Sequence, residues 1–234
     1  MTHRLGDVKE TSWRHYSCLY AWMRILWSQM TKVLGLFDRA YVINRDQDVA
    51  RMTLATERLA KVGIPFQRFS ARCFSDRGKH PCAGHRGANA SHLAIVVEAK
   101  EQNLDSVLIM EDDVIFRENF CDLWSQILPA LNHLKYDLFF GYNWRNRGGK
   151  PRNLRIVPIQ KTLCVHFWAI HSSFFSRFIT TALENEDTER PHCIDGIFTN
   201  KIARIFAPTY NLVGLDEGIS LVMENVPKAI RWSA

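Results

Sequence analysis

Residues 107–116 have the sequence VLIMEDDVIF, in which a run of apolar residues meets three adjacent acids, Glu111, Asp112 and Asp113. A continuous apolar run of this length predicts a strand buried on both faces, as in the middle of an α/β sheet. Three carboxylates at the end of such a strand repel one another, and each unpaired ion costs several kcal/mol to desolvate. A divalent cation would remove that cost, and carboxylate oxygens suit Mg²⁺ or Mn²⁺ better than zinc. The alternative is a solvated turn at the strand end, where the charges cost little.

Strands and helices are predicted to alternate around this stretch. Ahead of it we expect a strand at 40–44, a helix at 48–62, a strand at 66–69 and, after a glycine-rich loop, a helix at 91–102. This order is typical of an α/β fold with a doubly wound parallel sheet, in which ligands bind at the carboxyl ends of the strands. The second half is less regular, and we predict helices at 120–134, 172–183 and 194–203 and strands at 137–140 and 163–170. The helical spacing of Phe174, Phe175 and Phe178 indicates core positions.

The composition fits one large domain with an added N-terminal segment. The chain has 234 residues, 47% of them hydrophobic, which is enough for a full core. We expect residues 40–234 to form the domain and residues 1–39, which mix aromatic with basic residues, to form a helical extension. That extension would either rest on an anionic membrane surface or pack on the domain or a partner. No stretch approaches the ~20 apolar residues of a membrane span, and no secretory signal is visible, so we expect a cytoplasmic protein, with the inner face of a membrane as its place of peripheral contact.

The net charge of +6 and a pI near 9.1 indicate an anionic partner, such as nucleic acid, a membrane surface or a phosphorylated substrate. A metal-dependent nucleic-acid enzyme or a basic nucleic-acid-binding protein is therefore one alternative. Against it, the chain has no recognisable nucleic-acid-binding module, and its aromatic residues lie mostly in apolar runs. The basic loop at 145–152 is open to three interpretations: a lid over a diphosphate, a site for an anionic acceptor, or a flexible surface loop.

The cysteines indicate reduced thiols. Six of them are scattered at no regular spacing, which argues against a disulfide framework. Only Cys73 and Cys82 gather with histidines, His80 and His85, and their spacing matches no standard zinc pattern.

Three motifs, in this order along the chain, resemble glycosyltransferase family 25, which includes lipooligosaccharide and collagen galactosyltransferases. They are Tyr41-Val42-Ile43-Asn44 followed by Arg51, then Gly87-Ala88-Asn89-Ala90-Ser91-His92-Leu93, then Glu111-Asp112-Asp113. Weaker likenesses at 165–170, Ile194-Asp195 and 218–220 extend the resemblance over roughly residues 40–222. The chain departs from the family at Arg45, Ala88 and Trp168, where the family has Leu, Cys and Tyr.

The resemblance implies a GT-A-like fold, with a Rossmann-like, mostly parallel sheet flanked by helices. It also implies transfer of a hexose, galactose from UDP-galactose, with inversion, to a saccharide or glycolipid acceptor such as a lipopolysaccharide core, and no nucleic-acid partner. A cation, Mn²⁺ or Mg²⁺, would stabilise the negative charge that develops on the departing diphosphate. Strand alternation would direct Glu111 and Asp113 to one face to hold that cation and Asp112 to the other, toward the ribose or a supporting partner.

The remaining site residues also follow from the resemblance. The donor would be bound by Asn44, Arg51, Ser91, His92 and Asp112. Three of these have plainer interpretations: Asn44 as a turn residue or cap, Arg51 as a solvated helix charge, and His92 as a core histidine. For the catalytic base we predict Asp195, because it lies between apolar neighbours at an expected helix start and matches the family's valine-aspartate pair. An N-cap role is its alternative, and Asp216 and Glu217 are the next candidates.

Overall fold

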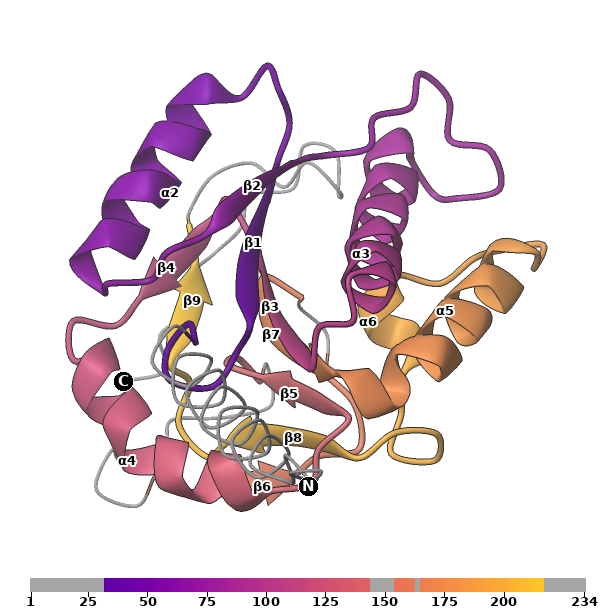
Figure 1. The fold of residues 1–234 in the computed structure, drawn as a ribbon. Helices are drawn as coiled ribbons and strands as arrows, with labels where there is room; N and C mark the ends of the chain where they lie inside the picture. The colour runs from indigo at the N-terminus through magenta and orange to yellow at the C-terminus, as the bar shows by residue number, and fades with distance from the viewer. Residues whose placement is uncertain (1–31, 144–153, 163–164, 217–234) are drawn as a thin grey trace, which may run out of the picture.

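The computed structural model describes residues 32–143, 154–162 and 165–216. Its main element is a seven-stranded sheet with the order β2-β1-β3-β7-β5-β8-β6 (Figure 1). The strands are β1 (Arg39–Asn44), β2 (Gln67–Ser70), β3 (Ser106–Glu111), β5 (Leu138–Phe140), β6 (Ile156–Pro158), β7 (Phe167–His171) and β8 (Ile205–Pro208). All but β6 and β7 run in the same direction. The predicted α/β class with a mostly parallel sheet is therefore confirmed.

Helices cover both faces of this sheet, as Figure 1 shows. They are α2 (Val49–Lys61), α3 (Ala83–Glu101), α4 (Phe120–His133), α5 (Ser172–Glu186) and α6 (Ile194–Ile197). Alternate residues of β3 enter two separate cores: Leu108 packs with residues of α2 and α4, and Ile109 packs with residues of α3 and α5. This double burial explains the continuous apolar run at 107–110. Phe174, Phe175 and Phe178 of α5 are buried in the second core, as predicted.

The first half of the chain follows the predicted parallel pattern, and the second half departs from it. Strands β1, β2 and β3 pair in parallel around α2 and α3. Strand β7 then pairs antiparallel with both β3 and β5. A parallel connection needs a crossover, usually a helix, and the residues described between β5 and β7 contain none. The doubly wound parallel pattern of the first half therefore does not extend to β7, and the sheet is mostly, not wholly, parallel.

The start of α3 also differs from the prediction. The helix begins at Ala83, capped by the Cys82 side chain, so the segment predicted as a glycine-rich loop before residue 91 is mostly helical. Gly87 lies inside this helix, with its Cα against the Arg72 backbone. A side chain does not fit there, because an added Cβ would come 2.4 Å from the Arg72 carbonyl oxygen. A residue that normally marks a loop is here required for close packing.

The C-terminal part was predicted least well. The expected helix at 194–203 is reduced to the single turn of α6, and the strands β6, β8 and β9 (Val213–Leu215) were not foreseen. Strand β9 pairs with β4 (Val114–Phe116) in a separate two-stranded sheet. The apolar residues after the acids therefore do not continue β3; they begin a second sheet, and the acids form the turn between the two.

Part of the predicted N-terminal extension packs on the domain. Phe37 is fully buried, with its ring centroid 5.9 Å from that of Trp124 on α4, whose indole N–H donates to the carbonyl of Leu34 at 3.0 Å. The Asp38 carboxylate accepts the backbone N–H of Ser106, at the start of β3, at 3.0 Å. The predicted boundary at residue 39 thus falls within packed structure, and residues 1–31 lie outside the described part.

Candidate active site

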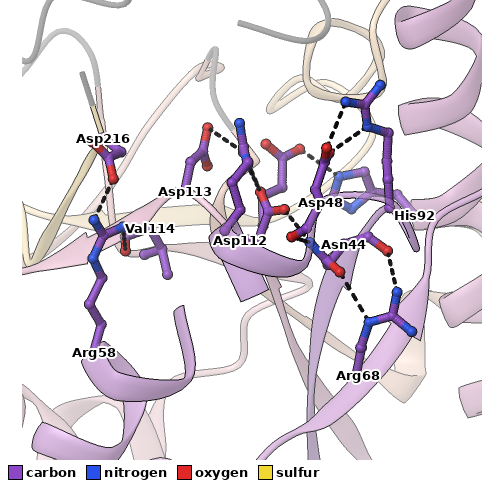
Figure 2. A network of polar contacts seen from close by, with 12 residues as sticks. Asn44, Asp48, Arg58, Arg68, His92, Asp112, Asp113, Val114 and Asp216 are labelled. Atoms are coloured by element: carbon purple, nitrogen blue, oxygen red, sulfur yellow. Dashed lines mark hydrogen bonds and ion pairs between the residues drawn. The ribbon is translucent and has the colours of Figure 1, made fainter. Parts of the chain in front are cut away.

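The three acids of residues 111–113 lie at the carboxyl end of β3, and each side chain has different neighbours (Figure 2). Asp112 and Asp113 are buried, with 6% and 4% of their surface exposed, and Glu111 is half-buried. Because the strand ends at Glu111, alternation along β3 no longer decides where the next two side chains point. Their positions are set by the polar groups that contact them.

Asp112 is held by two side chains from the neighbouring β1–α2 segment. Asn44 Nδ2, at the end of β1, donates to Asp112 Oδ2 at 2.7 Å, and Arg51 Nε donates to Oδ1 at 3.0 Å. A second Arg51 nitrogen donates to the same oxygen. These partners lie 61 and 68 residues away in the sequence, so only the fold brings them to the carboxylate.

Arg51 supplies positive charge inside the acidic turn. Its terminal nitrogen lies 3.7 Å from Asp113 Oδ2, so one guanidinium contacts two of the three carboxylates. Burial alone would lower the pKa of Arg51, but the hydrogen bond and charge of Asp112 and the charge of Asp113 raise it above the ordinary value. Asp112 and Asp113 therefore do not form a solvated turn, and Arg51 is not a solvated helix charge.

Asn44 joins the acidic turn to the edge of the sheet. Its side chain is 2% exposed; Nδ2 also donates to the Asp48 carbonyl at 3.2 Å, and Oδ1 accepts from Arg68 Nε at 3.1 Å. The N-cap residue of α2 is Asp48, so Asn44 is not a cap. Arg68, on β2, is a member of this network that the sequence did not single out.

His92 orients Glu111. Its ring is fully buried, with Nε2 3.1 Å from Glu111 Oε1. The indole N–H of Trp168 donates to His92 Nδ1 at 3.2 Å. An indole nitrogen is only a donor, so Nδ1 must accept and the ring proton must lie on Nε2, directed at Glu111. His92 is thus buried as a core histidine would be, yet its hydrogen bonds fix the direction of a carboxylate.

Ser91 lies on another side of α3 from these contacts. Its hydroxyl is fully buried, donates to the Gly87 carbonyl at 2.7 Å and accepts the backbone N–H of Arg72 at 2.8 Å. Together with Gly87 it fixes the segment that follows β2 against the helix. Both hydrogen bonds of the hydroxyl go to the backbone, so the geometry gives Ser91 a structural role, and a direct contact with a donor stays a prediction.

Asp195 comes to the same end of the molecule from the second half of the chain. It lies in the first turn of α6, whose N-cap residue is Cys193, so Asp195 is not the N-cap. Burial raises the pKa of the Cys193 thiol to about 12, and the negative charges of Asp195 and Glu111 add to this shift. Both carboxylates therefore lie near one half-buried thiol, and Asp195 approaches the acidic turn from α6.

The alternative base candidates are placed differently. The Asp216 carboxylate pairs with Arg58 of α2, and its backbone N–H donates to the Asp113 carbonyl at 2.8 Å (Figure 2). Asp216 is therefore tied to the β4–β9 side of the acidic turn. Glu217, the basic loop at 145–152 and the predicted motif at 218–220 lie outside the described residues.

The sequence matches a family model over the segment that contains α3, the acidic turn and Trp168. Residues 78–179 match "Glycosyltransferase family 25 (LPS biosynthesis protein)". The matched segment is therefore similar to glycosyltransferase family 25. The match includes Ser91, His92, Glu111, Asp112 and Asp113 and ends before Asp195.

Two solved structures are distantly similar to this chain. The crystal structure of protein A197 from STIV is 16% identical, covers 75% of this chain and 83% of its own, and gives a TM-score of 0.44. A glycosyltransferase involved in the glycosylation of the major capsid of PBCV-1 is 11% identical, with 64% of this chain and 66% of its own covered and a TM-score of 0.37. No curated protein gives a significant match.

The described side chains form no large cluster of metal-ligating groups. Among the described residues, no group of three His, Cys, Asp or Glu side chains is arranged to hold a metal ion. Cys73 is exposed, and His80 and His85 contact each other instead, with their Nδ1 atoms 2.9 Å apart. The zinc alternative thus gains no support. No helix in the described ranges is long and apolar enough to cross a membrane.

Proposed function

We propose that this glycosyltransferase moves a hexose, galactose from UDP-galactose, to a saccharide acceptor such as a lipopolysaccharide or lipooligosaccharide core, with inversion and with the help of Mn²⁺ or Mg²⁺. The observation that carries the proposal is the position of Glu111 and Asp113 at the carboxyl end of β3 in a mostly parallel sheet, with Asp195 and Glu111 both close enough to the Cys193 thiol to affect it. Ligands of open α/β sheets bind beyond the carboxyl ends of the strands. The family match, which covers Glu111 and Asp113, supports a nucleotide-sugar donor.

Glu111 and Asp113 are the residues that would hold the cation. Both are oxygen donors, and Asp112 is already held by Asn44 and Arg51. Mg²⁺ and related ions are commonly bound by one or two carboxylates together with substrate phosphates, so two protein ligands fit such a site. When bound, the ion supplies charge that stabilises the departing nucleoside diphosphate.

Arg51 and Asn44 prepare the acidic turn for the donor. Arg51 offsets part of the negative charge of Asp112 and Asp113, and its partly exposed guanidinium could also bind a phosphate oxygen of the donor. Asn44 fixes Asp112 against the end of β1. The nucleoside would lie beside these residues, with Asp112 or Arg68 available to its ribose or base.

Asp195 is the proposed general base. In a single displacement the acceptor hydroxyl oxygen forms a bond to the anomeric carbon while the bond from that carbon to the diphosphate oxygen breaks. The diphosphate leaves with the electron pair, and the hydroxyl proton passes to the Asp195 carboxylate. Its place on α6, away from the β1–α2 residues that hold Asp112, suits attack from the face opposite the leaving group.

A donor panel tests the proposal directly. UDP-galactose, UDP-glucose, GDP-mannose and a CMP-sugar are compared, with and without Mn²⁺, for thermal stabilisation and for transfer to lipopolysaccharide cores. A ligand at 100 times its dissociation constant adds ~2.7 kcal/mol of stability, which a melting curve resolves. We expect the largest shift with UDP-galactose plus Mn²⁺, and no shift with any nucleotide sugar would overturn the proposal.

Contact with the inner face of a membrane is a second part of the proposal, because the acceptor is a glycolipid. The net charge of +6 and the aromatic and basic residues of the N-terminal segment favour anionic lipid. We expect the full chain to sediment with vesicles that contain anionic lipid and to be released by salt. Equal sedimentation of the chain with neutral and with anionic vesicles would contradict the proposed membrane contact but not the proposed sugar transfer.

A further inference from the structure

Asn89 of α3 makes hydrogen bonds that reach the segment carrying Asp195. The side chain is 2% exposed. Its Nδ2 donates to Glu186 Oε1 at 3.0 Å and to the His192 carbonyl at 2.9 Å, and its Oδ1 accepts the backbone N–H of Ile194 at 2.9 Å. One amide therefore holds the chain at His192 and at Ile194, the first residue of α6, immediately ahead of Asp195.

We propose that Asn89 is a positioning residue for Asp195. The inference rests on the proposed function, in which Asp195 is the general base. It assigns Asn89 a role through the backbone of the Asp195 segment rather than through contact with the donor.

The geometry of α6 explains why such support is needed. The helix has four residues, and its N-cap, Cys193, makes no side-chain capping hydrogen bond. A single turn has little stability of its own, because nucleation fixes several residues for one hydrogen bond. The first N–H groups of a helix also lack partners within it. Asn89 supplies the missing acceptor at Ile194, whose side chain is buried with 4% exposed.

The orientation of the Asn89 amide is itself fixed. Its nitrogen faces two oxygens and its oxygen faces an N–H group, so a flipped amide would place like groups together. Glu186, one of the two acceptors, also contacts His80 Nε2 at 2.7 Å. The support for α6 is therefore continuous with the buried polar groups of α5 and of the segment before α3.

Asn89 and His92 lie three residues apart on one helix, and side chains at this spacing share a face. His92 orients Glu111, and Asn89 holds the segment that bears Asp195. One rigid helix thus fixes the distance between a proposed metal ligand and the proposed base. A displacement of about 1 Å is enough to lower a rate by roughly 10²-fold.

Asn185 of α5 provides a matched control. Its Nδ2 donates to the same His192 carbonyl at 3.0 Å, and its Oδ1 accepts the His192 N–H at 2.9 Å. Both asparagines are buried and both hold His192, but the hydrogen bond to Ile194 comes from Asn89. Loss of general packing should affect both variants, whereas loss of positioning should affect Asn89 alone.

The test compares Asn89→Ala and Asn185→Ala in the wild-type and Asp195→Asn backgrounds. Turnover, the donor KM and the melting temperature are measured with the donor that the panel selects. We expect the two variants to lose similar amounts of melting temperature. For Asn89→Ala, kcat should fall by roughly 10- to 100-fold with little change in donor KM. For Asn185→Ala, kcat should fall by less than about threefold. In the Asp195→Asn background, Asn89→Ala should cost little further turnover, because the group that it positions is gone. Asn89→Ser replaces it if the alanine variant does not fold.

The outcomes separate the two levels of the argument. Equal kcat for the two alanine variants, or a full further loss from Asn89→Ala in the Asp195→Asn background, would overturn the positioning role while leaving Asp195 as the base. Wild-type turnover in Asp195→Asn itself would overturn the base assignment in the proposed function, and the role of Asn89 with it.

Discussion

The two sides of the candidate site are held by different kinds of interaction. On the strand side, formed by Asn44, Arg51, Asp112 and Asp113, charged groups contact one another directly, and Arg51 is shared between two carboxylates. On the helix side, Asp195 lies on a short turn whose backbone is held by neutral amides, chiefly that of Asn89. Charge fixes one side and backbone hydrogen bonds fix the other.

Because of this difference, we expect mutations on the two sides to affect different measurable properties of the protein. A buried ion that loses its partner destabilises a protein strongly, so on the strand side loss of Arg51 should be felt in folding and loss of Asp113 in metal binding. A carboxylate on a supported turn can lose its charge with little effect on folding, so changes at Asp195 should be felt in the reaction. The following predictions test that contrast, beginning with the largest effect.

The largest effect is expected for Asp195→Asn. Loss of a general base typically lowers a rate by roughly 10²- to 10⁴-fold, and the isosteric amide should keep the melting temperature within about 2 °C. Turnover, donor affinity and melting temperature are measured together. Preserved turnover would remove Asp195 as the base and make Asp216→Asn and Glu217→Gln the next variants to compare.

Asp113→Asn should lower transfer by roughly 10²-fold, because a cation ligand worth several kcal/mol in the transition state is lost. Folding should survive or improve slightly, since repulsion between the neighbouring carboxylates is relieved. The apparent Kd for Mn²⁺, measured by titration with the donor present, should rise in parallel. Near-normal metal-dependent transfer would show that Asp113 does not hold the ion.

Arg51→Gln should mainly affect stability. It leaves Asp112 and Asp113 without their buried counter-ion, at a cost of roughly 3 kcal/mol, the lower end of the range for a broken buried pair because Arg51 is partly exposed. In the absence of nucleotide, Mn²⁺ should raise the melting temperature of this variant more than that of the wild type, since it can replace the missing charge.

Arg51→Lys is the control for that experiment, because it keeps the charge but not the two-nitrogen contact with Asp112. It should fall between the wild type and Arg51→Gln in stability and should gain less from Mn²⁺ than Arg51→Gln. An unchanged melting temperature in Arg51→Gln would contradict the counter-ion role of Arg51.

The smallest effect concerns His85 of α3. Its Nδ1 contacts His80 Nδ1, and the other ring nitrogen of His80 contacts Glu186 of α5. Burial and the neighbouring His80 lower the pKa of His85, and the charge of Glu186 opposes them only in part. The folded protein then binds a proton less readily than the unfolded chain, so stability is full above about pH 6.5 and is lost as the pH falls through the folded pKa. The loss is at most about 1.4 kcal/mol per pH unit.

Denaturant unfolding between pH 7.5 and pH 5 measures this dependence, with His85→Asn as the comparison. The variant should show a flatter stability profile than the wild type over that interval. Identical slopes would mean that other groups cause the pH dependence.

The sequence predicted the elements whose signal is local. Strand β3 was recognisable because both faces are buried, and α5 was recognisable from its phenylalanine spacing. The antiparallel direction of β7 was missed, because strand direction depends on the connection and has no local pattern. The start of α3 was missed because the reason for Gly87, the carbonyl of Arg72, lies elsewhere in the fold.

The same limit applies to the site. The acids and their neighbours were predicted as a group, but the sequence argument relied on a metal ion to offset their repulsion and did not pair Arg51 with Asp112, 61 residues away. Asn89 was visible in the quoted motif, yet its partners at His192 and Ile194 come from more than 100 residues later. Distant hydrogen bonds of this kind need the folded structure.

Trp168 has a consequence for how the site can be observed. Its indole donates to His92, which contacts Glu111, and its ring lies buried among Phe140 and Phe178. Indole emission is sensitive to the charges and hydrogen bonds around the ring, so an ion arriving at Glu111 acts on a fluorophore that is two contacts away. The protein therefore carries a built-in optical reporter of its own acidic turn, placed where the solvent cannot quench it.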